Sequence, residues 1–104
     1  MTAMPGFVRI GENRFKFPAD SAWFDGHFDG APIVPGVAHL ALALAACQTD
    51  RILRGVRNVR FSNPIFPDDE LEVVVDESGS GSSIRFEIRC HTGIATAGVL
   101  IFEP

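Results

Sequence analysis

The sequence is short of cysteine, of basic residues and of long apolar runs, and each shortage removes a class of protein. Its two cysteines, Cys47 and Cys90, lie far apart without Cys-x-x-Cys spacing, which argues against a zinc site or a disulfide framework and favours two small buried apolar residues. Nine basic residues stand against 13 acidic ones, and this net charge of −4 gives no electrostatic footprint for nucleic acid. No apolar run reaches the roughly 20 residues that cross a bilayer.

The length and the first residues limit how the chain can be organised. Its 104 residues fit one domain over residues 1–104, and such a domain buries only roughly two thirds of its unfolded surface, so we expect a partner subunit. The opening Met-Thr-Ala-Met-Pro-Gly lacks the basic start and apolar core of a signal peptide, and we expect a soluble cytoplasmic protein. No two histidines have metal-ligand spacing, so no metal is expected.

The first half of the chain predicts a strand pair or an extended edge, then an ordered loop and a helix. Residues 7–17 alternate around a Gly-Glu-Asn turn, and residues 19–35 hold glycines and prolines with three large aromatics, which is typical of an ordered loop. Residues 36–48 are rich in alanine and leucine after Pro35, a residue suited to a helix start. This segment is apolar nearly all round, so we expect a helix buried on most sides.

The second half predicts antiparallel strands. Alternating residues mark strands at 56–61, 71–75 and 84–90, and a run of small residues marks a strand at 94–102. A proline-rich break at 64–69 and turns at 78–83 and 92–93 separate these strands. One long helix and four or five strands in about 100 residues indicate an α+β fold, in which a highly curved antiparallel sheet wraps a central helix.

The functional signal is concentrated around His27. This histidine lies among glycines, prolines and aromatics just before the predicted helix, where a fixed imidazole could transfer a proton beside a polarised carbonyl. The alternative is a loop histidine whose ring only satisfies neighbouring backbone carbonyls.

Two segments carry a resemblance to a known family. Gly26-His-Phe-Asp-Gly-Ala-Pro-Ile-Val-Pro-Gly-Val37 is followed by Val59-Arg-Phe-Ser-Asn-Pro-Ile-Phe-Pro-Asp-Asp-Glu-Leu71, and together they resemble the β-hydroxyacyl-acyl-carrier-protein dehydratases of the hot-dog superfamily. The similarity covers residues 14–103. It implies a hot-dog fold, with the long helix wrapped by the sheet, and a homodimer or higher homo-oligomer with sites at the interface.

The resemblance also implies a reaction. Family members dehydrate 3-hydroxyacyl thioesters carried on phosphopantetheine, and His27 matches their base. Gly36 matches the residue whose N–H binds the thioester oxygen, in agreement with the unpaired N–H groups and positive dipole end of a helix start. The carrier would be acyl carrier protein or coenzyme A, and no cofactor is expected beyond the phosphopantetheine of the substrate. The expected substrate-binding residues are Phe28, Pro32, Val34, Val37 and Ala41.

The sequence departs from the family pattern on the helix. The dehydratases carry an acid fourteen residues after the histidine and often a Gln four residues later, but this chain has Ala41 and Ala45 there. His39 lies about 200° around the helix from Ala41, on nearly the opposite side, so we do not expect it to replace the acid. The possible substitute acids are Asp25 and Asp29, which flank His27, or an acid of the partner subunit.

Three hypotheses follow. The first is a lyase, a dehydratase acting on 3-hydroxyacyl thioesters in fatty acid or polyketide-type metabolism. The second is a catalytically degraded hot-dog subunit that binds acyl chains or carrier protein, or that completes the site of an active homologue. The third, an acyl-thioesterase, is weakened by the same missing carboxylate.

Four arginines and two further histidines are the other charged or titratable residues of interest. Four arginines at a spacing of three are either a solvated edge or a docking site for a phosphate or an acidic carrier protein: Arg51, Arg54, Arg57 and Arg60. His39 is interpreted as a core or interface histidine with one satisfied nitrogen rather than a second base. His91 is expected in a turn.

Overall fold

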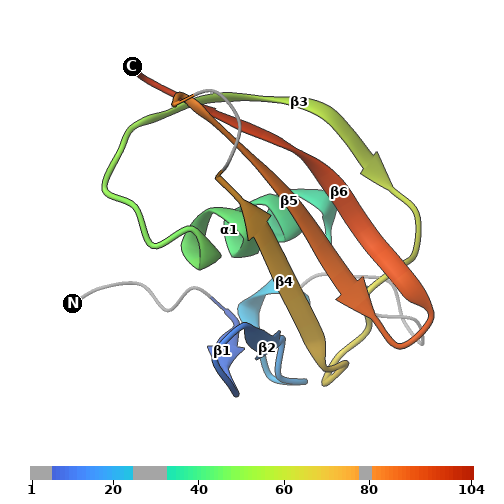
Figure 1. Cartoon of the computed structure of the whole chain (residues 1–104). Helices are drawn as coiled ribbons and strands as arrows, with labels where there is room; N and C mark the ends of the chain where they lie inside the picture. The colour runs from blue at the N-terminus through green and yellow to red at the C-terminus, as the bar shows by residue number, and fades with distance from the viewer. Residues whose placement is uncertain (1–5, 25–32, 78–80) are drawn as a thin grey trace.

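A six-stranded antiparallel sheet curves around one α-helix in the part of the chain that the computed structural model describes, residues 6–24, 33–77 and 81–104 (Figure 1). The elements are β1 (Val8–Arg9), β2 (Arg14–Lys16), the 3₁₀ turn η1 (Ala22–Phe24), α1 (Gly36–Ala46), β3 (Leu53–Phe61), β4 (Leu71–Asp76), β5 (Ser83–Cys90) and β6 (Gly93–Phe102). This arrangement confirms the predicted α+β fold with a helix wrapped by a curved sheet. No helix among these residues is long and apolar enough to cross a membrane.

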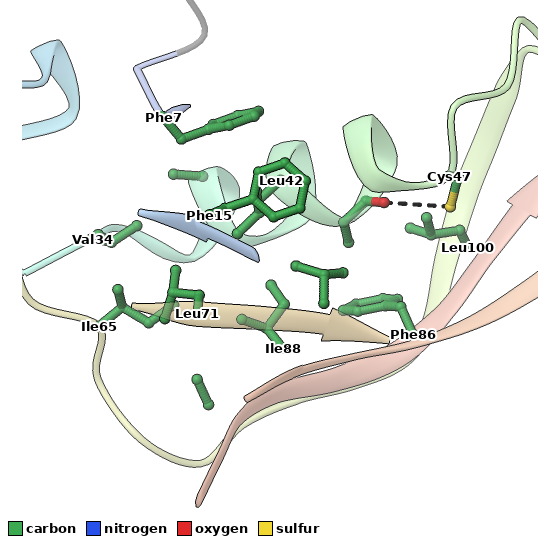
Figure 2. Packing of buried hydrophobic residues seen from close by; sticks show 14 of the residues in the cluster. Phe7, Phe15, Val34, Leu42, Cys47, Ile65, Leu71, Phe86, Ile88 and Leu100 are labelled. Atoms are coloured by element: carbon green, nitrogen blue, oxygen red, sulfur yellow. Dashed lines mark hydrogen bonds between the residues drawn. The ribbon is translucent and has the colours of Figure 1, made fainter. Parts of the chain in front are cut away.

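The strand order β1-β2-β4-β5-β6-β3 places the long strands β5 and β6 inside the sheet and β3 at one edge. Apolar side chains from the inner face of the sheet pack against α1 (Figure 2). The alternation predicted for residues 84–90 is seen in β5, where Ile84, Phe86 and Ile88 are all buried. Leu71 and Val73 of β4 extend the same layer.

The helix is shorter and more open than the sequence predicts. It ends at Ala46, two residues before the predicted end, because Gln48 adopts a left-handed conformation with φ of 51°. Its buried residues, Ala38, His39, Leu42 and Ala43, lie toward the sheet, whereas Val37 is 62% exposed. The prediction of burial on most sides is therefore wrong for the chain alone, because the sheet covers only one face of α1.

Strand β3 departs from the regular alternation predicted for residues 56–61. Asn58 has φ of 56°, and the pairing with β6 shifts register between Arg57 and Arg60. Arg57 lies opposite Val99 and Arg60 opposite Ala97, so three steps along β3 match two steps along β6. This is a β-bulge, which adds one residue to one strand and reverses the face on which later side chains lie.

The N-terminal segment forms the predicted strand pair, with β1 antiparallel to β2 and β2 antiparallel to β4. In the loop that follows, Trp23 and Phe24 are half-buried against the core, as expected for an ordered loop, although the short 3₁₀ turn there was not predicted.

The two cysteines differ. Cys47 is buried at the end of α1, and its Sγ donates a hydrogen bond to the Ala43 carbonyl oxygen at 3.3 Å (Figure 2). Cys90 is only half-buried, and its Sγ lies 3.1 Å from Thr92 Oγ1. The prediction of burial is confirmed for Cys47 and wrong for Cys90, because Cys90 ends β5 beside the turn. His91 lies in that turn, as predicted.

Candidate active site at the start of the helix

The start of α1 is held in place by backbone contacts. Pro35 precedes the helix in an extended conformation, and its carbonyl oxygen accepts a hydrogen bond from Ala38 N at 2.9 Å. Val34 N donates to the Ile65 carbonyl oxygen at 2.8 Å, which ties the entry of the helix to the proline-rich segment after β3. As the first helical residue, Gly36 has an N–H without a partner inside the helix, at the positive end of the helix dipole.

A cavity of about 370 Å³ opens at this helix start. It is bordered by Ile33, Val34, Pro35, Gly36, His39, Phe61, Ser62, Asn63 and Pro64. None of these residues is an acid, and most of the lining is apolar. A peptide N–H beside such a cavity can stabilise an oxyanion more strongly than in water, because the surrounding dielectric is low.

His39 forms one wall of this cavity and is 3% exposed. Its Nδ1 shares a hydrogen bond with Thr96 Oγ1 of β6, and its ring meets the Phe61 ring edge to face at a centroid distance of 5.3 Å. Burial lowers the pKa of His39 below its ordinary value, and the Val34 carbonyl offsets part of this shift. The prediction of a core histidine with a satisfied nitrogen is confirmed.

Several residues of this cavity were not predicted as site residues, and Phe61 and Asn63 are two of them. The Phe61 ring covers Gly36, and Asn63 Nδ2 donates to the Ile94 carbonyl oxygen at 2.7 Å, which holds the chain after β3 against the start of β6. Both belong to the second motif, which begins at Val59. That motif carries part of the resemblance to the dehydratases, and it also held the signal for these two residues.

A second, larger cavity of about 520 Å³ lies on another side of the helix. Ala41, Leu44 and Ala45 of α1 form one side of it, opposite Gly6, Phe7, Ala22 and Trp23. The lining formed by these described residues is also apolar, and none of them is an acid. Ala41 and His39 line different cavities, in agreement with the predicted separation around the helix.

The structure separates the predicted site residues. Val34 and Gly36 lie together at the first cavity, and Ala41 lies at the second, whereas Val37 is exposed and lines neither. The other predicted residues lie outside the described part of the chain: Asp25, His27, Phe28, Asp29 and Pro32. Among the described residues, no group of three or more His, Cys, Asp or Glu side chains could hold a metal ion.

The four arginines after the helix are all exposed. Arg51 is held by the C-terminal strand, since its guanidinium lies 5.5 Å from the centroid of the Phe102 ring and donates to the Glu103 carbonyl oxygen at 3.4 Å. The other three lie on β3, and none of them forms an ion pair with a described residue: Arg54, Arg57 and Arg60.

The curved sheet wrapped around one helix, with an apolar cavity at the start of that helix, defines a protein of the hot-dog fold. Residues 10–99 match the family model of the ApeI-like dehydratases, and this chain belongs to that family.

Curated relatives agree with this assignment. The 3-hydroxyacyl-[acyl-carrier-protein] dehydratase FabZ of Mannheimia succiniciproducens is 37% identical over 85 residues, which cover 70% of this chain and 54% of the relative. FabZ of Nitratidesulfovibrio vulgaris strain Miyazaki F is 38% identical over 64 residues, covering 49% of this chain and 42% of the relative. The chain thus spans about half the length of the curated relatives it matches.

Two solved structures share the fold. One is the dehydratase heterocomplex ApeI:P from Xenorhabdus doucetiae, with a TM-score of 0.74, 19% identity and 94% of each chain covered. The other is an uncharacterized protein from Erwinia carotovora subsp. atroseptica, with a TM-score of 0.74, 27% identity, and coverage of 88% of this chain and 80% of that one. These likenesses confirm the predicted hot-dog fold.

Proposed function

We propose that this chain is a dehydratase-like protein that binds 3-hydroxyacyl or 2-enoyl thioesters, presented by acyl carrier protein or coenzyme A, in fatty acid or polyketide-type metabolism. The observation that carries the proposal is that Gly36, whose N–H has no partner in the helix, borders an apolar cavity. A thioester oxygen placed there would be polarised, and His27 would remove the proton from the neighbouring carbon.

An assay in both directions tests the reaction. The purified protein is incubated with 3-hydroxyacyl and 2-enoyl thioesters, and loss or gain of the enoyl absorbance is followed for wild type, His27→Ala and His91→Ala. We expect His27→Ala to lose roughly 10²- to 10⁴-fold in rate, as for removal of a general base. His91 lies exposed in a turn, so His91→Ala should match wild type. Conversion that is equal in all three proteins would contradict the assignment of the base.

A second function, acyl-chain binding without efficient elimination, is favoured by the apolar cavity at Ala41 and Ala45. A dehydratase needs an acid to protonate the departing hydroxyl, and neither alanine can supply a proton. The Trp23 side chain lies opposite these alanines, so a hydrocarbon chain could occupy the space between them.

Restoring the acid separates the two functions. If the thioester binds productively and only the proton donor is missing, Ala41→Glu should raise the dehydration rate by roughly 10²- to 10⁴-fold, while the similarly sized Ala41→Gln should not. If the cavity holds an acyl chain, Ala41→Glu should instead weaken binding, because a carboxylate in an apolar cavity loses hydration.

Binding can be measured directly, because Trp23 is the only tryptophan of the chain and lines this cavity. Its fluorescence is titrated with acyl-pantetheine thioesters of increasing chain length. We expect the emission to change with longer chains and to stay constant with acetyl-pantetheine. A response that does not depend on chain length would argue against the acyl-binding function.

We further propose that the protein acts in the cytoplasm as a homodimer, paired through the edge strand β3. The support is the exposed edge itself, with Val56 at 41% and Phe61 at 54% exposure, and the open face of α1 around Val37. An unpaired strand edge offers a row of N–H and C=O groups to a second strand. Sedimentation velocity tests the pairing, which would be refuted by a monomer under all buffer conditions.

A further inference from the structure

The bulge in β3 gathers two arginines on one face of the sheet. Arg57 and Arg60 are three residues apart and would lie on opposite faces of a regular strand. Because of the bulge they lie opposite Val99 and Ala97, which are two apart on β6, so both arginines lie on the same face. The bulge thus makes Arg57 and Arg60 neighbours on one face of the sheet, although they are three residues apart in the sequence.

This face is the outer one. Val99 and Ala97 are paired across the sheet with Arg85 and Glu87, which are not buried, whereas Leu100 and its partner Ile84 form part of the core. The two arginines therefore project away from the helix, on the side of the sheet that faces away from both cavities.

Neither arginine is neutralised by the described residues around it. Their direct neighbours on β6 are Val99 and Ala97, and the acid in the next strand, Glu87, already pairs with Arg89 at 3.0 Å. Glu87 lies two strands from Arg60, about 10 Å away at the usual strand spacing. At physiological salt this distance is close to the screening length, so its effect on Arg60 is small.

Pairing of two copies through β3 would concentrate this charge. Strand β3 reads Leu-Arg-Gly-Val-Arg-Asn-Val-Arg-Phe, and arginine is its only charged residue type. In every register of an antiparallel self-pairing, arginines of one copy meet arginines or neutral residues of the other. Like charges across a strand pair are destabilising, whereas an anion between guanidinium groups is strongly bound.

We infer that Arg57 and Arg60 of two paired copies form a binding site for a phosphate group at the junction of their β3 strands, so that phosphate binding and dimerisation promote each other. The inference rests on the homodimer of the proposed function, but not on its catalysis. The phosphate group could come from inorganic phosphate or from a phosphorylated carrier such as coenzyme A. In either case, binding to the dimer in preference to the monomer shifts the equilibrium toward the dimer.

Sedimentation velocity over a range of protein concentrations tests this linkage, in chloride, in inorganic phosphate and in coenzyme A at matched ionic strength. We expect the dimer dissociation constant of wild type to fall at least roughly tenfold when either phosphate source replaces chloride. Arg57→Gln/Arg60→Gln should dimerise in chloride more tightly than wild type, since the repulsion is gone, and should not respond to phosphate.

Arg9→Gln/Arg14→Gln is the matched control, because it removes two exposed arginines from β1 and β2 at the other end of the sheet. It should keep the wild-type response.

A response to coenzyme A alone would support the site with an organic phosphate as its ligand. A wild-type dimer equally stable in all three solutions, or a response that persists in Arg57→Gln/Arg60→Gln, would overturn the inference while leaving the homodimer intact. A monomer in every solution would refute the homodimer as well, without bearing on the thioester assay.

Discussion

The Phe61 ring lies directly against the backbone of Gly36, and a Cβ added at position 36 would be 3.0 Å from Phe61 Cζ. Real Cβ atoms are almost never closer to a neighbour than this. The end of β3 and the start of α1 can therefore approach this closely only because Gly36 has no side chain. Because Phe61 also packs on His39, this contact sets the shape of the cavity beside the Gly36 N–H.

We expect Gly36→Ala to weaken thioester binding severalfold and to lower the stability by about 1 kcal/mol. This loss is at the lower end of the range for overpacking, because the Phe61 ring is 54% exposed and can turn aside. Turning would move the ring across the cavity. Calorimetric titration with a non-hydrolysable thioester analogue and urea unfolding measure the two effects. The double variant Gly36→Ala/Phe61→Leu should regain binding, since leucine leaves room for the added methyl group. If the single variant binds as tightly as wild type, the contact does not shape the site.

How far the fold could be predicted depended on the regularity of each strand. In β5 the apolar residues alternate without interruption, and the predicted face agrees with the burial of Ile84, Phe86 and Ile88. In β3 the sequence also alternates, but Asn58 takes a left-handed conformation and shifts the register. A bulge of this kind depends on how β3 follows the curved sheet, and a period-two pattern does not reveal it.

The sequence predicted the neighbours in the cavity that come from one segment of the chain. It did not predict those that come from two segments distant in sequence. Val34 and Gly36 are close in sequence and belong to one motif at the helix start, so their proximity follows from local structure. Phe61 is twenty-five residues beyond Gly36 and reaches it only because β3 turns back over the helix. The exposure of Val37 could not be predicted either, since it depends on how much of α1 the sheet covers.

The buried His39 should make stability depend on pH. Burial lowers its pKa in the folded protein, whereas the unfolded chain has the ordinary value near 6.5, so below that pH the unfolded state binds more protons. The contribution of His39 to stability is therefore complete above about pH 6.5 and is lost as the pH falls toward the folded-state pKa, by at most about 1.4 kcal/mol per pH unit.

Urea unfolding between about pH 5 and 8 measures this effect. His39→Gln keeps a group that can hydrogen-bond to Thr96 but does not titrate, so its stability should vary less with pH than that of wild type. His91→Ala, which removes an exposed histidine from a turn, is the control for the loss of a histidine elsewhere in the fold. Equal slopes for wild type and His39→Gln would assign the pH dependence to other groups.

Two glycines of the β3–β6 pair should respond oppositely to alanine. A Cβ at Gly98 would lie 2.9 Å from Val59 Cγ2 and 3.1 Å from Val59 Cα, and backbone cannot move aside as a side chain can. Gly98→Ala should cost about 1–3 kcal/mol. Gly55, on the neighbouring strand, has nothing within 4 Å of an added Cβ, so Gly55→Ala should leave stability unchanged or raise it slightly. Urea unfolding measures both, and similar losses for the two variants would refute the steric explanation.

The two thiols should react at very different rates. Burial, with a smaller contribution from the charge of Glu77, raises the pKa of Cys47 to about 11, and its Sγ donates to the Ala43 carbonyl oxygen. At pH 8 only about one Cys47 in a thousand is therefore a thiolate, the reactive form, and its sulfur is covered by the core. Cys90 is half-buried at the end of β5 and should react with a disulfide reagent first.

We expect one fast and one slow thiol in the folded protein. Cys90→Ala should remove the fast phase and Cys47→Ala the slow one, with both thiols reacting rapidly in urea. A rate for Cys47 that rises in proportion to the unfolded fraction would indicate that it reacts only through unfolding, as expected for a sulfur packed between the helix end and the sheet. Fast modification of Cys47 at urea concentrations where the protein stays folded would contradict its place in the core.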